Sequence, residues 1–289
     1  MKTLNFAPKT HRIFPVWMRL LFVAGLSAGS LPAQEAVPGP DATPDPEAAA
    51  QVRPEKTDPA SRQLIRNYLT VSGGAEDHEK LRNVVARGRL TEAGRVKQFE
   101  LIELRDGRRH LSLSWRHLGR NYKEVHVFDG LTAWKQALRP ERKDAVDYTG
   151  QEGVHFANQR WLLQPFVRPA VADYTFKYQG AAKVAGRPCH VVVGYGKKDV
   201  RSWFYFDQEK FLVLRWGGFG ELAGVREYLD YRSTKFRRVG GVLLPGEIDL
   251  LAENAAFGRI EFEVILPNQP VDPGRFNKPR SRTPVLRQR

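Results

Sequence analysis

The sequence has 289 residues, with 46 Lys and Arg against 32 Asp and Glu, and a formal net charge of +14 at pH 7. This length allows one large domain or two small ones, and a hydrophobic fraction of 42% is too high for a wholly disordered chain. A single Cys excludes an internal disulfide framework and a zinc site built from several cysteines. The net charge fits a nucleic-acid-binding, a membrane-surface or a merely soluble protein equally well.

The first 33 residues have the pattern of a secretory signal peptide. Four basic residues and no acidic residue precede an apolar run over 20–31, and small residues follow up to Ala33. The run is shorter than the roughly 20 apolar residues that span a bilayer. We therefore predict a cleaved signal peptide over residues 1–33 and an exported, periplasmic protein. An uncleaved signal anchor is the alternative.

Prolines and acidic residues dominate residues 34–60, which contain no aromatic residue and no apolar periodicity. This composition predicts a disordered acidic linker. Residues 280–289 contain four Arg and no acidic residue, which predicts a flexible basic tail. In an exported protein such a tail suits an anionic membrane surface better than nucleic acid, and a purely solubilising tail is the alternative. The folded domain is expected over residues 61–279.

The folded part begins with a predicted helix. Asp58 and Pro59 are suited to the N-cap and the first helical position, and apolar residues then recur at helical spacing until Gly73 and Gly74. A short second helical turn is expected over residues 76–81.

From Val84 onward the apolar period changes from about 3.6 to 2, which indicates strands with one apolar face. We expect about ten or eleven strands between Val84 and Leu266. Residues 153–171 interrupt the pattern and predict a short helix and a loop on the sheet. The fold class is therefore α+β, with a curved antiparallel meander.

The apolar strand faces are bulky, and the consecutive aromatic residues 203–206 populate both faces of one strand. Such faces either enclose a cavity for an apolar ligand or fill an ordinary core against the helices, and the pattern alone favours the core. The candidate lining residues are Leu111, Leu113, Trp115, Tyr174, Phe176, Tyr178, Phe204, Phe206, Leu212, Leu214, Trp216 and Phe262.

Several segments carry a resemblance to a known family. They are 68–74 (YLTVSGG), 81–83 (LRN), 86–88 (ARG), 99–101 (FEL), 127–130 (VFDG) with Ala133 and Trp134, 204–207 (FYFD), 242–245 (VLLP) and 271–279 (VDPGRFNKP). Together they resemble the LolA-like periplasmic proteins, which include lipoprotein carriers and outer-membrane lipoprotein-sorting proteins. The resemblance implies an incomplete antiparallel β-barrel, with helices covering an apolar concave side that accepts acyl chains. It therefore favours the cavity over the ordinary core.

Catalytic signatures are not found. The sequence has no Gly-x-Ser-x-Gly, no His-Glu-x-x-His and no phosphate-binding loop, and its His residues lack metal-ligand spacing. Cys189 shares a strand face with Val191 and Val193, which predicts a buried, inert thiol. Glu261 and Glu263 share a wet face and are expected to be solvated.

The sequence as a whole predicts a non-enzymatic, exported, carrier-like protein without cofactor, metal site or catalytic residues. Its expected ligand is the acyl part of a lipid or an acylated lipoprotein, and nucleic acid is not an expected partner. The alternative is an envelope interaction or sensor domain whose core is filled by its own side chains. Such a domain would act through its surface and its basic tail.

Overall fold

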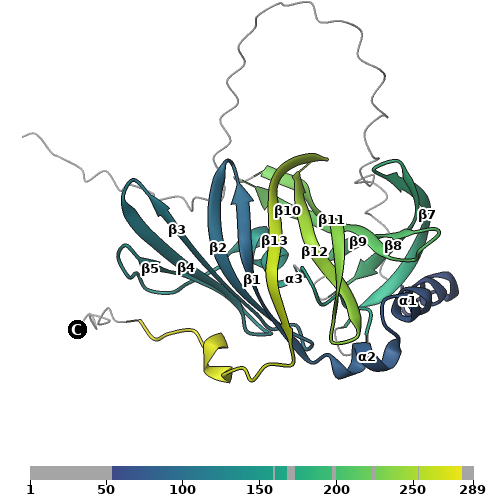
Figure 1. Ribbon diagram of the computed structural model, residues 1–289, viewed down its shortest axis with the longest axis horizontal. Coiled ribbons are helices and arrows are strands. Elements are labelled where there is room, and N and C mark those ends of the chain that lie inside the picture. The colour runs from purple at the N-terminus through teal and green to yellow at the C-terminus, as the bar shows by residue number, and fades with distance from the viewer. Residues whose placement is uncertain are drawn as a thin grey trace, which may run out of the picture.

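The computed structural model describes residues 54–158, 160–167, 173–196, 200–222, 225–252 and 254–281. The predicted signal peptide, residues 34–53 of the linker and residues 282–289 of the tail lie outside the described residues. In the described part, thirteen strands form one sheet in the order β6-β5-β4-β3-β2-β1-β13-β12-β11-β10-β9-β8-β7 (Figure 1).

The helices are α1 (Pro59–Val71), α2 (Ala75–Lys80), α3 (Gly150–Asn158) and the 3-10 helix η3 (Pro273–Phe276). The strands are β1 (Asn83–Glu92), β2 (Arg95–Leu104), β3 (Arg109–His117), β4 (Arg120–Phe128), β5 (Ala133–Arg139), β6 (Val146–Asp147), β7 (Thr175–Val184), β8 (Arg187–Tyr195), β9 (Arg201–Asp207), β10 (Val213–Leu222), β11 (Val225–Val239), β12 (Val242–Ala252) and β13 (Ala255–Pro267).

Each strand of the sheet is antiparallel to its neighbours, and β1 pairs with both β2 and β13. Among the described strands, β6 and β7 form the two ends of the sheet, so the sheet is open. This arrangement fits the expected incomplete barrel. The strand number exceeds the expected ten or eleven partly because β6 has two residues and is too short to show a period of 2. That helices cover the concave side stays a prediction.

Local sequence signals explain where α1 begins, as predicted. The Asp58 side chain accepts a hydrogen bond from the Ser61 amide at 2.8 Å, and Pro59 occupies the first helical position. The same carboxylate accepts the Tyr178 amide of the end strand β7 at 2.6 Å. One aspartate therefore starts the helix and covers part of a sheet edge, which would otherwise expose unpaired backbone groups. The short second helix α2 is also found where it was expected.

Gly88 of the resemblance segments has a structural role at the centre of the sheet. A Cβ atom at this position would collide with the carbonyl oxygen of Glu261 on β13. The pairing of β1 with β13 also shifts register between Arg87 and Gly88. Only glycine tolerates this close approach of two backbones.

Alternation along the strands produces buried clusters on both faces of the sheet. We call the face that carries the largest cluster, with contributions from α1 and from the chain after α3, the inner face. Phe204 and Phe206 belong to the inner cluster, whereas Trp203 and Tyr205 belong to a second cluster on the outer face. The consecutive aromatic residues of β9 thus populate both faces, as the sequence predicted.

The C-terminal strap, residues 268–281, runs along the outer face of β2–β5. Phe276 is buried there with Ile102, Val127 and Trp134. The strap is held by Arg275, which contacts Glu100 at 2.6 Å, and by Lys278, which contacts Asp147 at 2.7 Å. The described strap is therefore part of the domain.

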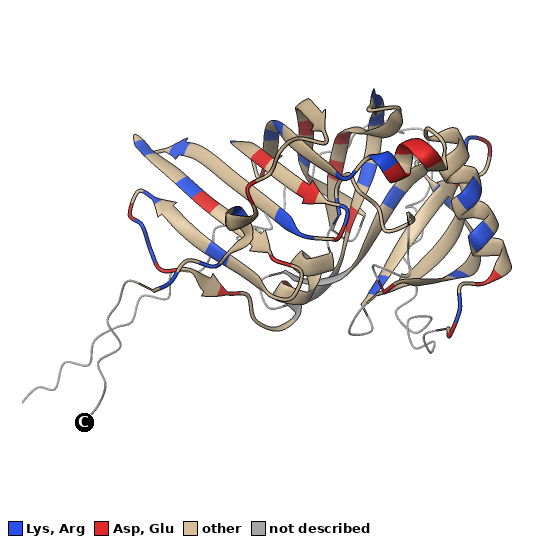
Figure 2. Cartoon of the chain, turned by 90° about the horizontal axis from the view of Figure 1, so that it is seen from below, with Lys and Arg blue, Asp and Glu red and all other residues tan. Residues whose placement is uncertain are grey.

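Exposed strand positions carry ion pairs. Figure 2 shows Lys and Arg interspersed with Asp and Glu along the strands. Arg89 lies 3.5 Å from Glu261 and 3.3 Å from Glu263. These two glutamates are partly exposed, which confirms that they are solvated.

Candidate functional site

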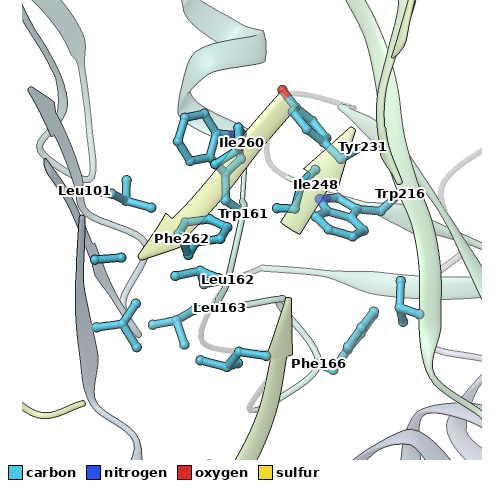
Figure 3. Close-up of a cluster of buried hydrophobic side chains, with 14 of the residues drawn as sticks. Leu101, Trp161, Leu162, Leu163, Phe166, Trp216, Tyr231, Ile248, Ile260 and Phe262 are labelled. Atoms are coloured by element: carbon cyan, nitrogen blue, oxygen red, sulfur yellow. The ribbon is translucent and has the colours of Figure 1, made fainter. Parts of the chain in front are cut away.

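A segment that follows α3 lies on the inner face of the sheet. We call residues 160–166 the plug. Its side chains Trp161, Leu162, Leu163 and Phe166 are all buried within the inner cluster (Figure 3). Their exposed fractions are at most 6%. The plug confirms the expectation of a loop laid on the sheet.

The plug contacts both halves of the inner face. The Trp161 ring lies edge-on to Phe99 of β2, with 5.9 Å between ring centroids, and 6.5 Å from Phe262 of β13. Phe166 lies 4.9 Å from Phe204 of β9 and 5.2 Å from Tyr68 of α1. The plug therefore joins β2 and β13 to β9 and α1, although β9 does not pair with β2 or β13.

The structure brings ten of the twelve predicted lining residues together around this segment. Eight are buried in the inner cluster, and Trp115 and Tyr178 pack against it while partly exposed. The eight are Leu111, Leu113, Tyr174, Phe176, Phe204, Phe206, Trp216 and Phe262. Lipid binding by these residues stays a prediction.

Leu212 and Leu214 instead belong to the outer cluster of β7–β11. Strict alternation would place Leu212, Leu214 and Trp216 on one face. The pairing of β10 with β9 shifts register between Val213 and Arg215, and such an irregularity changes the face to which following side chains point. Val213 and Trp216 therefore share the inner face, and Leu214 does not.

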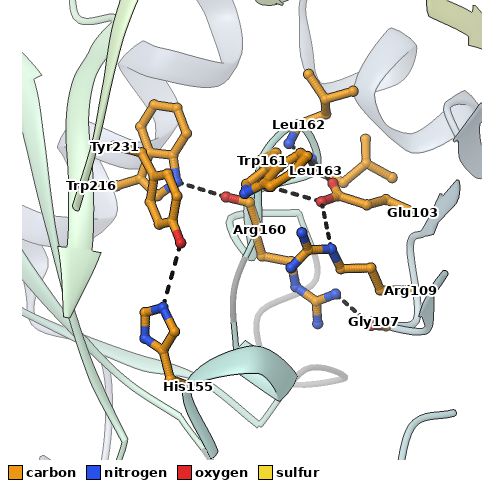
Figure 4. A network of polar contacts seen from close by, with 10 residues as sticks. All are labelled: Glu103, Gly107, Arg109, His155, Arg160, Trp161, Leu162, Leu163, Trp216 and Tyr231. Atoms are coloured by element: carbon orange, nitrogen blue, oxygen red, sulfur yellow. Dashed lines mark hydrogen bonds and ion pairs between the residues drawn. The ribbon is translucent and has the colours of Figure 1, made fainter. Parts of the chain in front are cut away.

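A buried glutamate beneath the plug was not predicted from the sequence. Glu103 at the end of β2 is 0% exposed, and its carboxylate accepts three successive backbone amides of the plug (Figure 4). The distances are 2.8 Å to Trp161, 3.0 Å to Leu162 and 2.9 Å to Leu163. These amides would otherwise be buried donors without partners, so the carboxylate satisfies the plug backbone.

Arg109 of β3 lies beside Glu103, with its Nε atom 3.8 Å from the carboxylate. Its guanidinium lies above the rings of Phe156, at 5.0 Å, and Trp161, at 4.6 Å. Burial lowers the pKa of Arg109 below its usual value, and the negative charge of Glu103 opposes this effect. The sequence did contain a signal for this pair, because Glu103 and Arg109 continue the alternation of Phe99, Leu101 and Leu111 on the apolar face.

The beginning of the plug is anchored to strands on both sides. The Arg160 guanidinium donates to the Gly107 carbonyl in the β2–β3 turn at 2.5 Å. The Arg160 carbonyl accepts the Trp216 indole N–H of β10 at 2.7 Å. Figure 4 shows these contacts next to the Glu103 carboxylate. The plug is thus held by directional bonds at its first four residues and by apolar contacts further along.

A recess of about 30 Å³ lies beside the plug, lined by His155, Asn158, Trp216 and Tyr231 among others. This volume suits about one water molecule. Because the plug side chains occupy the inner cluster, an acyl chain on this face would have to displace them.

Buried histidines make stability depend on pH. Burial lowers the pKa of His78, His110 and His155 to about 4, from the usual 6.5. Between about pH 6.5 and pH 4 the unfolded chain therefore binds protons that the folded chain does not, so the free energy of unfolding is highest above about pH 6.5 and falls as the pH drops toward 4. We expect this loss to reach up to about 3 kcal/mol per group. Urea unfolding at pH 7 and pH 4.5 measures the change.

Replacing His155 with Asn should remove its share of this pH dependence. The same replacement of His117, which is exposed, is the matched control. An unchanged pH dependence in the His155 variant would contradict the assignment.

Among the described residues, no group of three or more His, Cys, Asp and Glu residues could hold a metal ion. Cys189 is a buried thiol that forms no disulfide, and it lies in the outer cluster with Val191 and Val193, where burial was predicted. Searched over the same residues, no helix is long and apolar enough to cross a membrane.

No family model and no curated protein matches the sequence. Several solved structures are similar to the chain. One is a domain described as an outer membrane lipoprotein-sorting protein from Vibrio parahaemolyticus, with 9% identity, a TM-score of 0.49, and coverage of 75% of this chain and 96% of that chain. A LolA superfamily protein from Nitrosomonas europaea has 10% identity, a TM-score of 0.46, and coverage of 72% and 94%. A DUF1329 family protein from Desulfovibrio piger has 13% identity, a TM-score of 0.42, and coverage of 76% and 98%.

Proposed function

We propose that this exported protein binds acyl chains of a lipid or an acylated lipoprotein on its inner face, without converting them chemically. The observation that carries the proposal is the plug, an apolar segment held over an aromatic sheet face by a buried carboxylate. The carboxylate satisfies three amides of the plug while the plug is buried, and water satisfies the same amides when the plug is released. Release of the plug therefore leaves no buried backbone donor without a partner.

The energetics allow an acyl chain to compete with the plug. Removing a buried tryptophan from its contacts costs about 3–5 kcal/mol. Each CH₂ group of a ligand contributes about 0.8 kcal/mol when it is buried. About six methylene groups therefore offset the loss of the Trp161 contacts alone, and offsetting the loss of the Leu162, Leu163 and Phe166 contacts as well requires a correspondingly longer acyl chain.

Lipid extraction and a binding assay test this function. The purified full chain is extracted with organic solvent for mass spectrometry, and the delipidated protein is titrated with a fluorescent fatty acid. We expect copurified acyl lipid and saturable binding that lysophospholipid displaces. A protein that repeatedly carries no lipid and does not bind the fatty acid would contradict the proposal.

The burial of the plug also favours the second candidate, an interaction or sensor domain with a self-filled core. In that case the plug never leaves the inner face, and partners contact the outside of the domain. The titration separates the two, because a self-filled domain does not bind the fatty acid. The basic tail of this second candidate lies almost wholly outside the described residues.

Contact with an anionic membrane is supported by the tip of the β3–β4 hairpin. Leu118 is 86% exposed there, between the exposed residues Arg116 and Arg120. Trp115 and Tyr122 stack at 5.2 Å immediately inside the tip. An exposed aliphatic side chain with cations and interfacial aromatic residues is suited to a lipid headgroup layer.

Replacing Leu118 with Asp is therefore expected to weaken binding to phosphatidylglycerol vesicles by at least about tenfold, since burying a leucine contributes roughly 1.5–3 kcal/mol. Leu131 offers a matched control, because it is also 86% exposed but lies in the β4–β5 turn beside Asp129. Vesicle sedimentation measures both variants. An equal loss of vesicle binding in the two variants would show that the hairpin tip is not the membrane-contact site.

A further inference from the structure

A second recess lies between the β2–β3 turn and the C-terminal strap, and Val167, the residue that follows the plug, also lines it. Its volume is about 480 Å³. This volume falls within the usual range of small-molecule pockets, about 300–1,000 Å³.

The walls of this recess combine apolar and basic groups. Leu104, Val271 and Phe276 supply apolar surface and belong to, or pack against, the outer cluster under the strap. Arg82, Arg105 and Arg108 also line it, whereas Asp106 is the single acidic residue among its described lining residues. The excess of guanidinium groups produces a positive potential over an apolar floor.

The arginines are positioned by neighbouring groups. Arg105 donates to the Leu81 carbonyl at 2.8 Å and to the His78 carbonyl at 2.5 Å, which orients its guanidinium. Arg108 lies 5.2 Å above the Phe276 ring and pairs with Asp106 at 2.8 Å. Arg82 has its backbone amide bound to the Asn268 side chain at 2.7 Å and its side chain exposed. Three different segments thus place guanidinium groups around one recess.

We propose that this recess binds a small amphiphilic anion, with a phosphate or carboxylate group among the arginines and a short apolar chain against Leu104, Val271 and Phe276. Guanidinium groups bind such oxyanions through paired, charge-assisted hydrogen bonds. The lining comes from residues 82–83, the end of β2 with the β2–β3 turn, the strap and Val167, and none of the plug residues 160–166 is part of it, so binding here does not require acyl binding at the inner face. The recess borders the turn whose Gly107 holds Arg160 of the plug, so the amide of Gly107 reports on binding.

The test is a titration of the full chain with octyl phosphate, followed by NMR and calorimetry. We expect saturable shifts at Gly107 and at the Asn83 side-chain amide, weakened by salt. The indole signals of Trp161 and Trp216 distinguish this site from the inner face. Shifts confined to those indoles, or no binding at all, would overturn the proposal.

Arg82→Glu is the informative variant, because its side chain is exposed and its loss leaves the carbonyl contacts of Arg105 in place. We expect the affinity for octyl phosphate to fall at least about tenfold, which corresponds to about 1.4 kcal/mol. Lys183→Glu makes the same charge change at an exposed position of the β7–β8 hairpin, many strands away from β2, and should leave the affinity unchanged. Equal losses in both variants would indicate only a general charge effect and would refute the site.

Inorganic phosphate and octyl glucoside separate the two parts of the ligand. We expect inorganic phosphate to bind more weakly than octyl phosphate, and octyl glucoside not to shift Gly107. Equal affinity for inorganic phosphate would overturn the amphiphilic assignment. Fatty-acid binding at the inner face is read separately from the tryptophan indoles, so either site can fail without the other.

Discussion

Replacing Glu103 with Ala is expected to lower the free energy of unfolding by about 3–5 kcal/mol. The change leaves the amides of Trp161, Leu162 and Leu163 without the carboxylate that they contact at 2.8–3.0 Å. It also removes the negative charge beside the buried Arg109. Unfolding by guanidinium chloride, followed by tryptophan fluorescence, measures the loss.

Glu100 provides the matched control for this prediction, since it is a glutamate on the same strand. It pairs with Arg87 and Arg275 at the outer surface, where its side chain is 25% exposed. Partly exposed ion pairs contribute about 0–1 kcal/mol, so Glu100→Ala should have a small effect. If both variants lose the same stability, Glu103 does not hold the plug.

Replacing Trp161 with Ala is expected to lower the free energy of unfolding by about 3–5 kcal/mol and, at the same time, to strengthen fatty-acid binding. The stability falls because a buried indole that touches Phe99 and Phe262 is removed. Binding strengthens because a smaller side chain has to leave the inner face. The apparent affinity for the fatty acid rises with the population of the open form, in which the plug has left the inner face. We expect about a tenfold lower dissociation constant.

The control is Trp134→Ala. Trp134 is also buried, but it lies in the outer cluster beneath Phe276 of the strap. This variant should lose comparable stability without any gain in fatty-acid affinity. Tighter binding in both variants would point to general loosening of the domain, and unchanged binding in the Trp161 variant would argue against displacement of the plug.

Glu103 and Trp161 both stabilise the closed form, in which the plug lies on the inner face. Glu103 does so through the plug backbone, and Trp161 does so through its side chain. A ligand can shift this equilibrium only by the difference between its affinities for the open and closed forms. A protein with weaker plug contacts should therefore be both less stable and a better acyl binder.

Much of the fold could be predicted from local patterns. The cap at Asp58, the start at Pro59 and the apolar spacing of α1 lie within a few residues, and local propensities act at that range. Alternation similarly placed ten candidate residues on one face. It failed at Leu212 and Leu214, because the register shift in β10 depends on how β10 pairs with β9.

The sequence by itself determined the order of the elements, the apolar inner face and the buried Cys189, because each follows from residues close together in the chain. Only the tertiary structure decided what covers that face. Glu103 and Trp161 are 58 residues apart, and the Trp216 indole binds a carbonyl 56 residues away. Such contacts depend on the curvature of the sheet and the path of the chain after α3, which no local pattern encodes. The carboxylate at Glu103 acquires its role from this long-range geometry.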